Sequence, residues 1–309
     1  MLADVTGYVA ECRGAMPSSL QDGGHAHAAG GADGDQSTLA LFRIEDLRQC
    51  GDDARPGGAE GVAQRKAPAA HVQAGSIDSA VKQAKLVQAK FAKAPTGYML
   101  EGDIYANQKR WDEAERAYAA GQKAVPVPAF VVRRVQVADM AGTGAKGDAL
   151  AAEWIREQPK DMVVRTFLGE RALKLKDYRA SFNYYSTALA QQPENALLLN
   201  NVAWTGGKIG DPKALDYAAK AAELAPDAPA VIDTYGTLLV ERGQTERGLE
   251  MLHKAVHLAP AAAELRKNLG VALIKAGKKS EARTELETAL RLPDAARIKG
   301  EIEAALKTL

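Results

Sequence analysis

Proline recurs along this chain at a nearly constant step, and that regularity limits the possible folds more than any other feature. The prolines concerned are Pro126, Pro159, Pro193, Pro226, Pro260 and Pro293, at intervals of 33 or 34 residues. Most intervals contain two apolar stripes with helical spacing, separated by a turn. A unit of this length cannot bury its apolar faces alone, so neighbouring units must stack. The sequence therefore predicts an all-α solenoid of helix–turn–helix units.

The stretch from Pro229 to Ala262 is the most regular of these units. Its first half places four residues on one stripe of a helix: Ile232, Tyr235, Gly236 and Leu239. A turn is expected around Gly243. Three residues then share one face of a second helix: Gly248, Leu252 and Ala255. This helix must end near Pro260, because proline has no backbone N–H with which to continue it.

The chain divides into three segments by composition and periodicity. Residues 1–75 carry a formal charge of −4, from 6 Lys+Arg and 10 Asp+Glu, whereas residues 76–309 carry +5. The first segment is rich in glycine and is predicted to be disordered, or a non-native start to the solenoid. Residues 76–294 are predicted to form half a unit followed by six units. Residues 295–309 are predicted to form a C-terminal capping helix.

Residue size within the units predicts how the helices pack. A small residue recurs at one position of five first helices, where it lets the second helix approach: Gly102, Gly169, Ala203, Gly236 and Gly270. Large residues such as Tyr118 and Leu252 are expected to fill the grooves between one helix pair and the next. The unit from Pro128 to Pro159 departs from the pattern, because Arg134 occupies an apolar position and Gly142 loosens the turn. We expect it to be the least stable full repeat.

This pattern resembles the tetratricopeptide repeat, in which a large residue, Leu-Gly and Tyr are followed by Ala, an aromatic residue, Ala and Pro. The resemblance covers about residues 76–294 and implies a right-handed α-solenoid. Two stretches, Gly102-Asp103-Ile104-Tyr105 and Leu198-Leu199-Asn200-Asn201-Val202-Ala203-Trp204, more narrowly resemble the repeat lipoproteins of PEP-CTERM/exosortase exopolysaccharide systems in Gram-negative bacteria. Those lipoproteins start with a lipoprotein signal and have many more repeats. We therefore expect a truncated or altered N-terminus here.

The resemblance also implies a binding groove, because the first helices of such arrays line the concave face and contact ligands there. The positions carried over are Asp103, Asn107, Gln136, Glu170, Asn200, Asn201, Trp204, Asp233, Thr237, Lys267 and Asn268. These side chains would make the groove polar and mixed in charge. Asparagine suits a peptide ligand, because its amide both donates hydrogen bonds to a backbone and accepts them. The expected partner is a protein or a peptide.

The sequence contains no constellation typical of catalysis. No nucleophile elbow, zinc-protease motif, phosphate loop or spaced pair of acids occurs, so we predict neither an enzyme nor a cofactor. His253 and His257 lie four residues apart on a predicted second helix but have no third ligand nearby, and we predict no metal site. With a net charge of +1 and a pI near 7.7, the chain is not expected to bind nucleic acid. No run of residues is apolar enough to predict a membrane span.

The first residues carry Asp4 and Glu11 where a signal peptide would be apolar, so the chain as written is expected to remain in the cytoplasm. If the native start is missing, the protein is expected in the periplasm or attached to the outer membrane. We interpret the chain as a noncatalytic scaffold for a protein or peptide, within exopolysaccharide or envelope protein assembly. The alternative is a helical targeting module separated from a larger enzyme, such as a glycosyltransferase.

Overall fold

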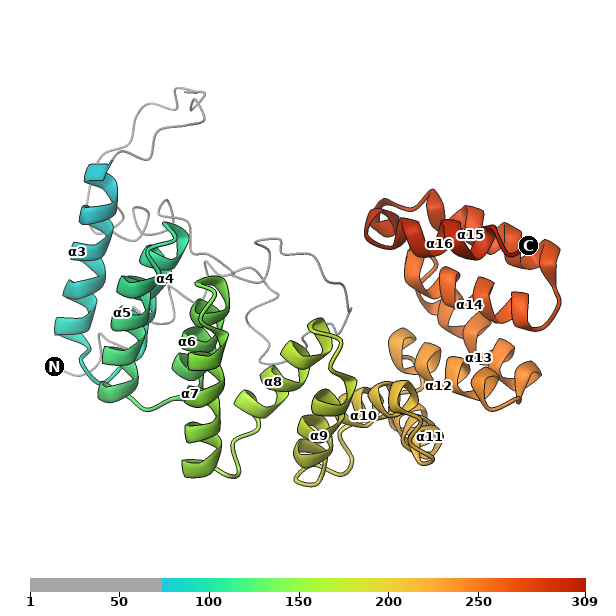
Figure 1. Cartoon of the computed structure of the whole chain (residues 1–309), viewed down its shortest axis with the longest axis horizontal. Coiled ribbons are helices and arrows are strands. Elements are labelled where there is room, and N and C mark those ends of the chain that lie inside the picture. The colour runs from blue at the N-terminus through green and yellow to red at the C-terminus, as the bar shows by residue number, and fades with distance from the viewer. Residues whose placement is uncertain (1–73) are drawn as a thin grey trace, which may run out of the picture. The chain divides into compact units, whose positions relative to one another are not determined.

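The computed structural model describes residues 74–309, and every regular element in that range is helical (Figure 1). Consecutive helices pack as hairpins, as predicted. The described chain falls into two compact units, which meet in sequence between Leu150 and Ala151. The predicted segment 1–75 lies outside the described residues, apart from its last two positions, which belong to the first helix.

The first unit, residues 74–150, holds four complete helices and the beginning of a fifth. They are α3 (Ala74–Lys90), α4 (Thr96–Asn107), α5 (Trp111–Ala124), α6 (Pro128–Met140) and the start of α7 (Gly144–Glu157). Each of α3, α4 and α5 packs against the helix that follows it. Proline occupies the first position of α6, where a missing N–H costs nothing because that group has no partner within a helix.

The second unit, residues 151–309, holds the remaining repeats and the C-terminal cap. Its first helices are α8 (Val163–Lys174), α10 (Ala196–Ile209), α12 (Pro229–Glu241) and α14 (Ala263–Lys275). Its second helices are α9 (Tyr178–Leu189), α11 (Ala214–Leu224), α13 (Thr245–Leu258) and α15 (Lys279–Leu290). The cap consists of a 3-10 turn, η3 (Pro293–Ile298), and α16 (Lys299–Leu306).

Small residues bring the two helices of a hairpin together, as the sequence predicted. A Cβ atom added at Gly236 would lie 2.9 Å from the carbonyl oxygen of Gly248 and 3.1 Å from the backbone nitrogen of Leu252. A Cβ atom at Gly169 would lie 2.8 Å from the ring of Tyr185. In each hairpin, the second helix therefore occupies the space that a side chain on the first helix would need.

Tyr118 packs within its own hairpin as well as toward the next one. Its ring lies over Gly102 and is almost fully buried, and it belongs to the same core cluster as Phe130 and Val137 of α6. Tyr185 repeats this arrangement over Gly169. The reason is geometric: without a Cβ atom, the glycine leaves a flat surface on the first helix, and an aromatic ring fills it.

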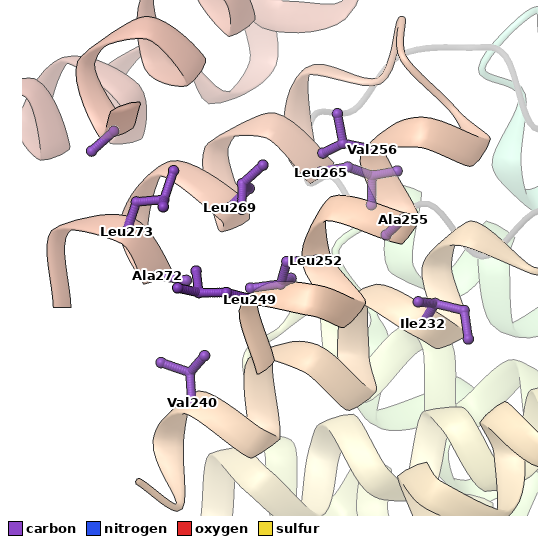
Figure 2. Packing of buried hydrophobic residues seen from close by; sticks show 11 residues of the cluster. Ile232, Val240, Leu249, Leu252, Ala255, Val256, Leu265, Leu269, Ala272 and Leu273 are labelled. Atoms are coloured by element: carbon purple, nitrogen blue, oxygen red, sulfur yellow. The ribbon is translucent and has the colours of Figure 1, made fainter. Parts of the chain in front are cut away.

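Clusters of buried residues extend from one repeat into the next. Figure 2 shows one cluster, which joins Ile232 and Val240 of α12, Leu252 of α13, and Leu269 and Leu273 of α14. The buried side chains thus come from the second helix of one unit as well as from the first helix of the following unit. Full burial of such a side chain is worth about 1.5–3 kcal/mol. Stability therefore depends on contacts between nearest neighbours, as expected for a stack of repeats.

The turn between the two helices of a hairpin contains a left-handed residue in six repeats. Four of these residues are glycines: Gly142, Gly210, Gly243 and Gly277. The other two are Lys109 and Lys176, with φ angles of 57° and 58°. A left-handed lysine carries strain that glycine does not, so these two turns store unfavourable backbone energy.

In the irregular repeat, the arginine at an expected apolar position forms hydrogen bonds with side chains of α5. Arg134 donates hydrogen bonds to Glu115 at 2.6 Å and to Gln122 at 2.8 Å, both on α5. The guanidinium of this predicted apolar position is therefore paired across the junction between two repeats.

The cap is shorter than the predicted helix, because residues 293–298 form a 3-10 turn before α16 begins. Ala295 and Ile302 are buried against Leu286 and its neighbours in the last hairpin. The side chain of Asp294 accepts a hydrogen bond of 3.0 Å from the backbone N–H of Ala263, the first residue of α14. The cap therefore covers the apolar end of the stack and also satisfies a free backbone donor there.

Candidate functional site

Contacts within the second unit identify its inner side. The first helix α10 touches α12, and α12 touches α14. Among the described helices, α11 makes no contact of that extent with α13, nor does α13 with α15. A stack whose first helices lie closer together than its second helices curves toward the first helices. The inward positions of α10, α12 and α14 therefore form one candidate surface, which we call the inner face.

The fifth residues of these three helices define a row across the inner face. They are Asn200 on α10, Asp233 on α12 and Lys267 on α14. The sixth residues add Asn201 and Asn268. All five were predicted as groove residues, and the repeat places them at equivalent levels on neighbouring helices.

Asp233 is the most strongly perturbed group in this row. Only 9% of the residue is exposed, and its Oδ2 accepts a hydrogen bond of 2.7 Å from Nδ2 of Asn268. Its Oδ1 accepts none within the described structure. Burial raises the pKa of Asp233 to about 7, although the Asn268 hydrogen bond and Lys267 act in the opposite direction. Near neutral pH, this carboxyl group exists as a mixture of its charged and neutral forms.

The two asparagines of α10, Asn200 and Asn201, are more buried than their predicted place in the groove indicated. Asn200 is 7% exposed and Asn201 is 9% exposed. The Oδ1 atom of Asn200 is buried and accepts no hydrogen bond from the described residues. The predicted groove therefore has polar groups at its base, beneath the surface that a partner would first meet.

Trp204 lies farther along α10 and is half-buried. Its ring meets Tyr178 of α9 edge to face, with 5.6 Å between ring centroids, and the Nζ of Lys208 lies 5.0 Å above it. These contacts fix the indole in one position and place a cation over its face. The tryptophan thus offers a partly open apolar surface beside the polar row.

The remaining predicted residues of the second unit are more separate. Thr237 of α12 is half-buried, whereas Glu170 of α8 is exposed. Lys267 is half-buried, and its Nζ donates to Glu301 of the cap at 2.8 Å. The only predicted pair that a hydrogen bond joins directly in this unit is Asp233 with Asn268, counted over residues 151–309.

In the first unit, the structure adds an arginine that the sequence reasoning missed. Asp103 of α4 accepts a 2.6 Å hydrogen bond from the hydroxyl of Tyr118, and its Oδ1 lies 3.5 Å from Nε of Arg133. Arg133 also donates to Gln136 at 3.4 Å, so it links two predicted residues. Burial, together with the charge of Asp103, raises the pKa of Tyr118. Asn107 is exposed at the end of α4.

Arg133 is not among the predicted groove residues, because its contact with Asp103 joins two different helices. Its position could have been found from the repeat, because it occupies the level of Asn201 and Asn268 in the later units. The polar network of this unit thus has a cation where the second unit has an amide.

The described residues contain neither a metal-binding cluster nor a helix able to span a membrane. His253 and His257 are both exposed on α13, and residues 74–309 contain no group of three or more side chains able to hold a metal. Across the same range, no helix is both long and apolar enough to cross a bilayer.

Comparison with known proteins relates two parts of the chain to one family. Residues 70–127 and residues 239–300 each match the tetratricopeptide repeat. None of the curated proteins compared matches the chain in sequence.

Solved structures match the chain at low sequence identity, one of them with a TM-score above 0.5. The Cut9–Hcn1 hetero-tetramer of the APC/C matches with a TM-score of 0.53 and 14% identity, over 75% of this chain and 46% of that chain. The chain therefore spans less than half the length of that structure. YrrB, described as a protein with an unusual peptide-binding site, matches at a TM-score of 0.41 with 15% identity, over 74% of this chain and 100% of its own. MamA from Desulfovibrio magneticus RS-1 matches at 0.46 with 20% identity, over 54% and 96%.

The helical hairpins, the glycine contacts between their helices and the two family matches agree with one another. Residues 70–127 and 239–300 therefore match tetratricopeptide repeats, and the described part of the chain has the all-α architecture of paired helices that the Cut9–Hcn1 structure shares.

Proposed function

We propose that this protein is a noncatalytic scaffold that binds a protein or peptide segment on the inner face of its first helices. The observation that carries the proposal is the row of polar residues at equivalent levels on α10, α12 and α14. Burial of polar side chains is unfavourable unless hydrogen bonds replace those lost to water. A surface that keeps such groups at the same level of three successive repeats has the chemistry required to bind a polypeptide.

The inner face combines two kinds of contact that a polypeptide needs. Asn201 and Asn268 carry amides that can bind a peptide backbone, and Trp204 offers an apolar surface held by its neighbours. Polar groups orient a ligand, whereas aromatic side chains supply most of the binding energy at interfaces. The proposal therefore assigns orientation to the amides and affinity to the tryptophan.

Capture of partners by the immobilised full-length chain tests this assignment. The groove variant combines Trp204→Ala with Thr237→Ala, since both side chains are only partly buried. The control combines Glu250→Ala with His253→Ala, which are exposed on the second helix α13. We expect the control to capture the same proteins as the unchanged chain and the groove variant to lose them, with all three equally helical by circular dichroism. Equal capture by the groove variant would show that the inner face is not the binding surface.

We also propose that the scaffold acts in exopolysaccharide or envelope protein assembly. This rests on the resemblance of Gly102–Tyr105 and Leu198–Trp204 to the repeats of PEP-CTERM-associated lipoproteins. Deletion of the gene is expected to reduce secreted exopolysaccharide, and expression of the unchanged chain should restore it. Normal exopolysaccharide in the deletion strain would rule out that role but leave the scaffold proposal intact.

A further inference from the structure

Two buried oxygen atoms on the inner face accept no hydrogen bond from any described residue. They are Oδ1 of Asn200 and Oδ1 of Asp233, and both residues are more than nine-tenths buried. Each is the fifth residue of its helix, and the two helices, α10 and α12, touch. An unpaired buried polar atom costs about 1–3 kcal/mol, so two of them at one level of the stack need a physical explanation.

Both unpaired atoms are acceptors, which restricts what could pair with them. A carboxylate ligand would bring a third acceptor and repel Asp233, whereas a group rich in N–H donors would satisfy both oxygens. The Nζ of Lys267, the cation at the same level of the next repeat, donates to Glu301 at 2.8 Å, and no donor within residues 74–309 is hydrogen-bonded to either oxygen. A basic group of a bound segment would supply the missing donors.

Neither oxygen would lose a hydrogen bond within residues 74–309 on meeting such a donor. Oδ1 of Asn200 has no hydrogen bond to lose when the side chain rotates. Asn268 of α14 donates its hydrogen bond to Oδ2 of Asp233. The Oδ1 atom of Asp233 takes no part in that bond. The amide of Asn268 thus fixes the carboxyl group while its second oxygen remains available.

We propose that Asn200 and Asp233 form a subsite for a lysine or arginine side chain of the bound segment. The cation pairs with the Asp233 carboxylate and donates a second hydrogen bond to Oδ1 of Asn200. This inference depends on the proposed function, because it specifies the chemistry of the segment that the inner face binds. It predicts a partner whose bound segment carries a lysine or an arginine.

An array of short random peptides, each acetylated at its N-terminus, provides the first test. The full-length chain, Asp233→Asn and Glu223→Gln are applied to identical arrays. Asp233→Asn keeps the side-chain shape and removes its charge, whereas Glu223→Gln makes the same charge change at an exposed position on α11. Circular dichroism checks that all three remain folded.

Peptides bound by the unchanged chain and by Glu223→Gln are expected to be enriched in lysine and arginine, and Asp233→Asn should lose this enrichment. Bound peptides without the enrichment, or with equal enrichment in Asp233→Asn, would overturn the subsite while the proposed function stands. Absence of any bound peptide would overturn both.

A second measurement tests whether the lysine of the peptide pairs with Asp233. The best basic peptide is titrated against each chain, together with a copy in which norleucine replaces its lysine. The replacement should weaken binding to the unchanged chain about tenfold or more, because a charge-assisted hydrogen bond is lost. It should have little effect on binding to Asp233→Asn. Equal losses in both chains would show that the lysine binds elsewhere.

Discussion

Gly236→Ala tests whether glycine is required where two helices of a hairpin cross. The added Cβ atom would lie 2.9 Å from the carbonyl oxygen of Gly248, 2.9 Å from Cγ of Leu252 and 3.1 Å from the Leu252 backbone nitrogen. Two of these three atoms belong to the backbone of α13. They cannot move aside by a change of rotamer, so α12 and α13 must separate.

The expected loss of stability follows from two opposing effects. Overpacking of a tight contact costs about 1–3 kcal/mol, and alanine recovers up to about 1 kcal/mol because it favours a helix more than glycine does. We therefore expect the free energy of unfolding to fall by about 1–2 kcal/mol, since the steric effect is the larger one.

Urea unfolding followed by circular dichroism measures this change. Gly300→Ala is the matched control, because no atom lies within 4 Å of a Cβ atom added at that position in α16. The control should be neutral or slightly stabilising. A Gly236→Ala protein as stable as the control would refute the reasoning, because it would show that the helix pair adjusts freely to a larger residue.

Three further predictions concern other parts of the chain. Lys176→Gly should raise the free energy of unfolding by about 0.5 kcal/mol, because relief of the left-handed strain exceeds the added flexibility of the unfolded chain; a lower urea midpoint would contradict this. A double-mutant cycle of Arg134→Leu and Glu115→Gln should give a coupling of about 1 kcal/mol, reduced from the value of a fully buried charged pair by partial exposure; coupling near zero would show that the arginine contributes nothing across the junction. The pKa of Asp233 is raised in the folded chain to about 7 from an ordinary value of 3.8, so protonation of this carboxyl group stabilises the fold. That stabilisation should be lost as the pH rises from about 4 through 7. The difference in unfolding free energy between the unchanged chain and Asp233→Asn, measured across this range, should therefore shift with pH, and a constant difference would refute the assignment.

The sequence alone determined the repeat, because its signals are local. Proline, glycine and the spacing of apolar residues act within a single hairpin, and they located the second helices, the turns and the small residues at the helix crossings. Gly236 and Gly248 could be recognised in this way, since a short period repeated along the chain leaves few other ways to bury the stripes.

The candidate site was only partly predictable, because offsets within a helix do not give depth. The repeat placed Asp233 and Asn268 in the predicted groove set, but their hydrogen bond joins residues 35 positions apart and depends on how α12 and α14 pack. Arg133 was missed for a related reason: its role depends on Asp103, which lies on a different helix.

The sequence thus determined which residues repeat, and the tertiary structure decided which of them are buried and paired. Tyr118 illustrates the difference, because its place in the pattern indicated a large packing residue but not that its ring would cover Gly102 of its own hairpin. Asn200 and Asp233 illustrate it again, since only the packing of neighbouring repeats buries their oxygens and leaves them without donors. Helix formation depends on nearby residues, whereas burial and hydrogen-bond satisfaction depend on residues that only the folded chain brings together.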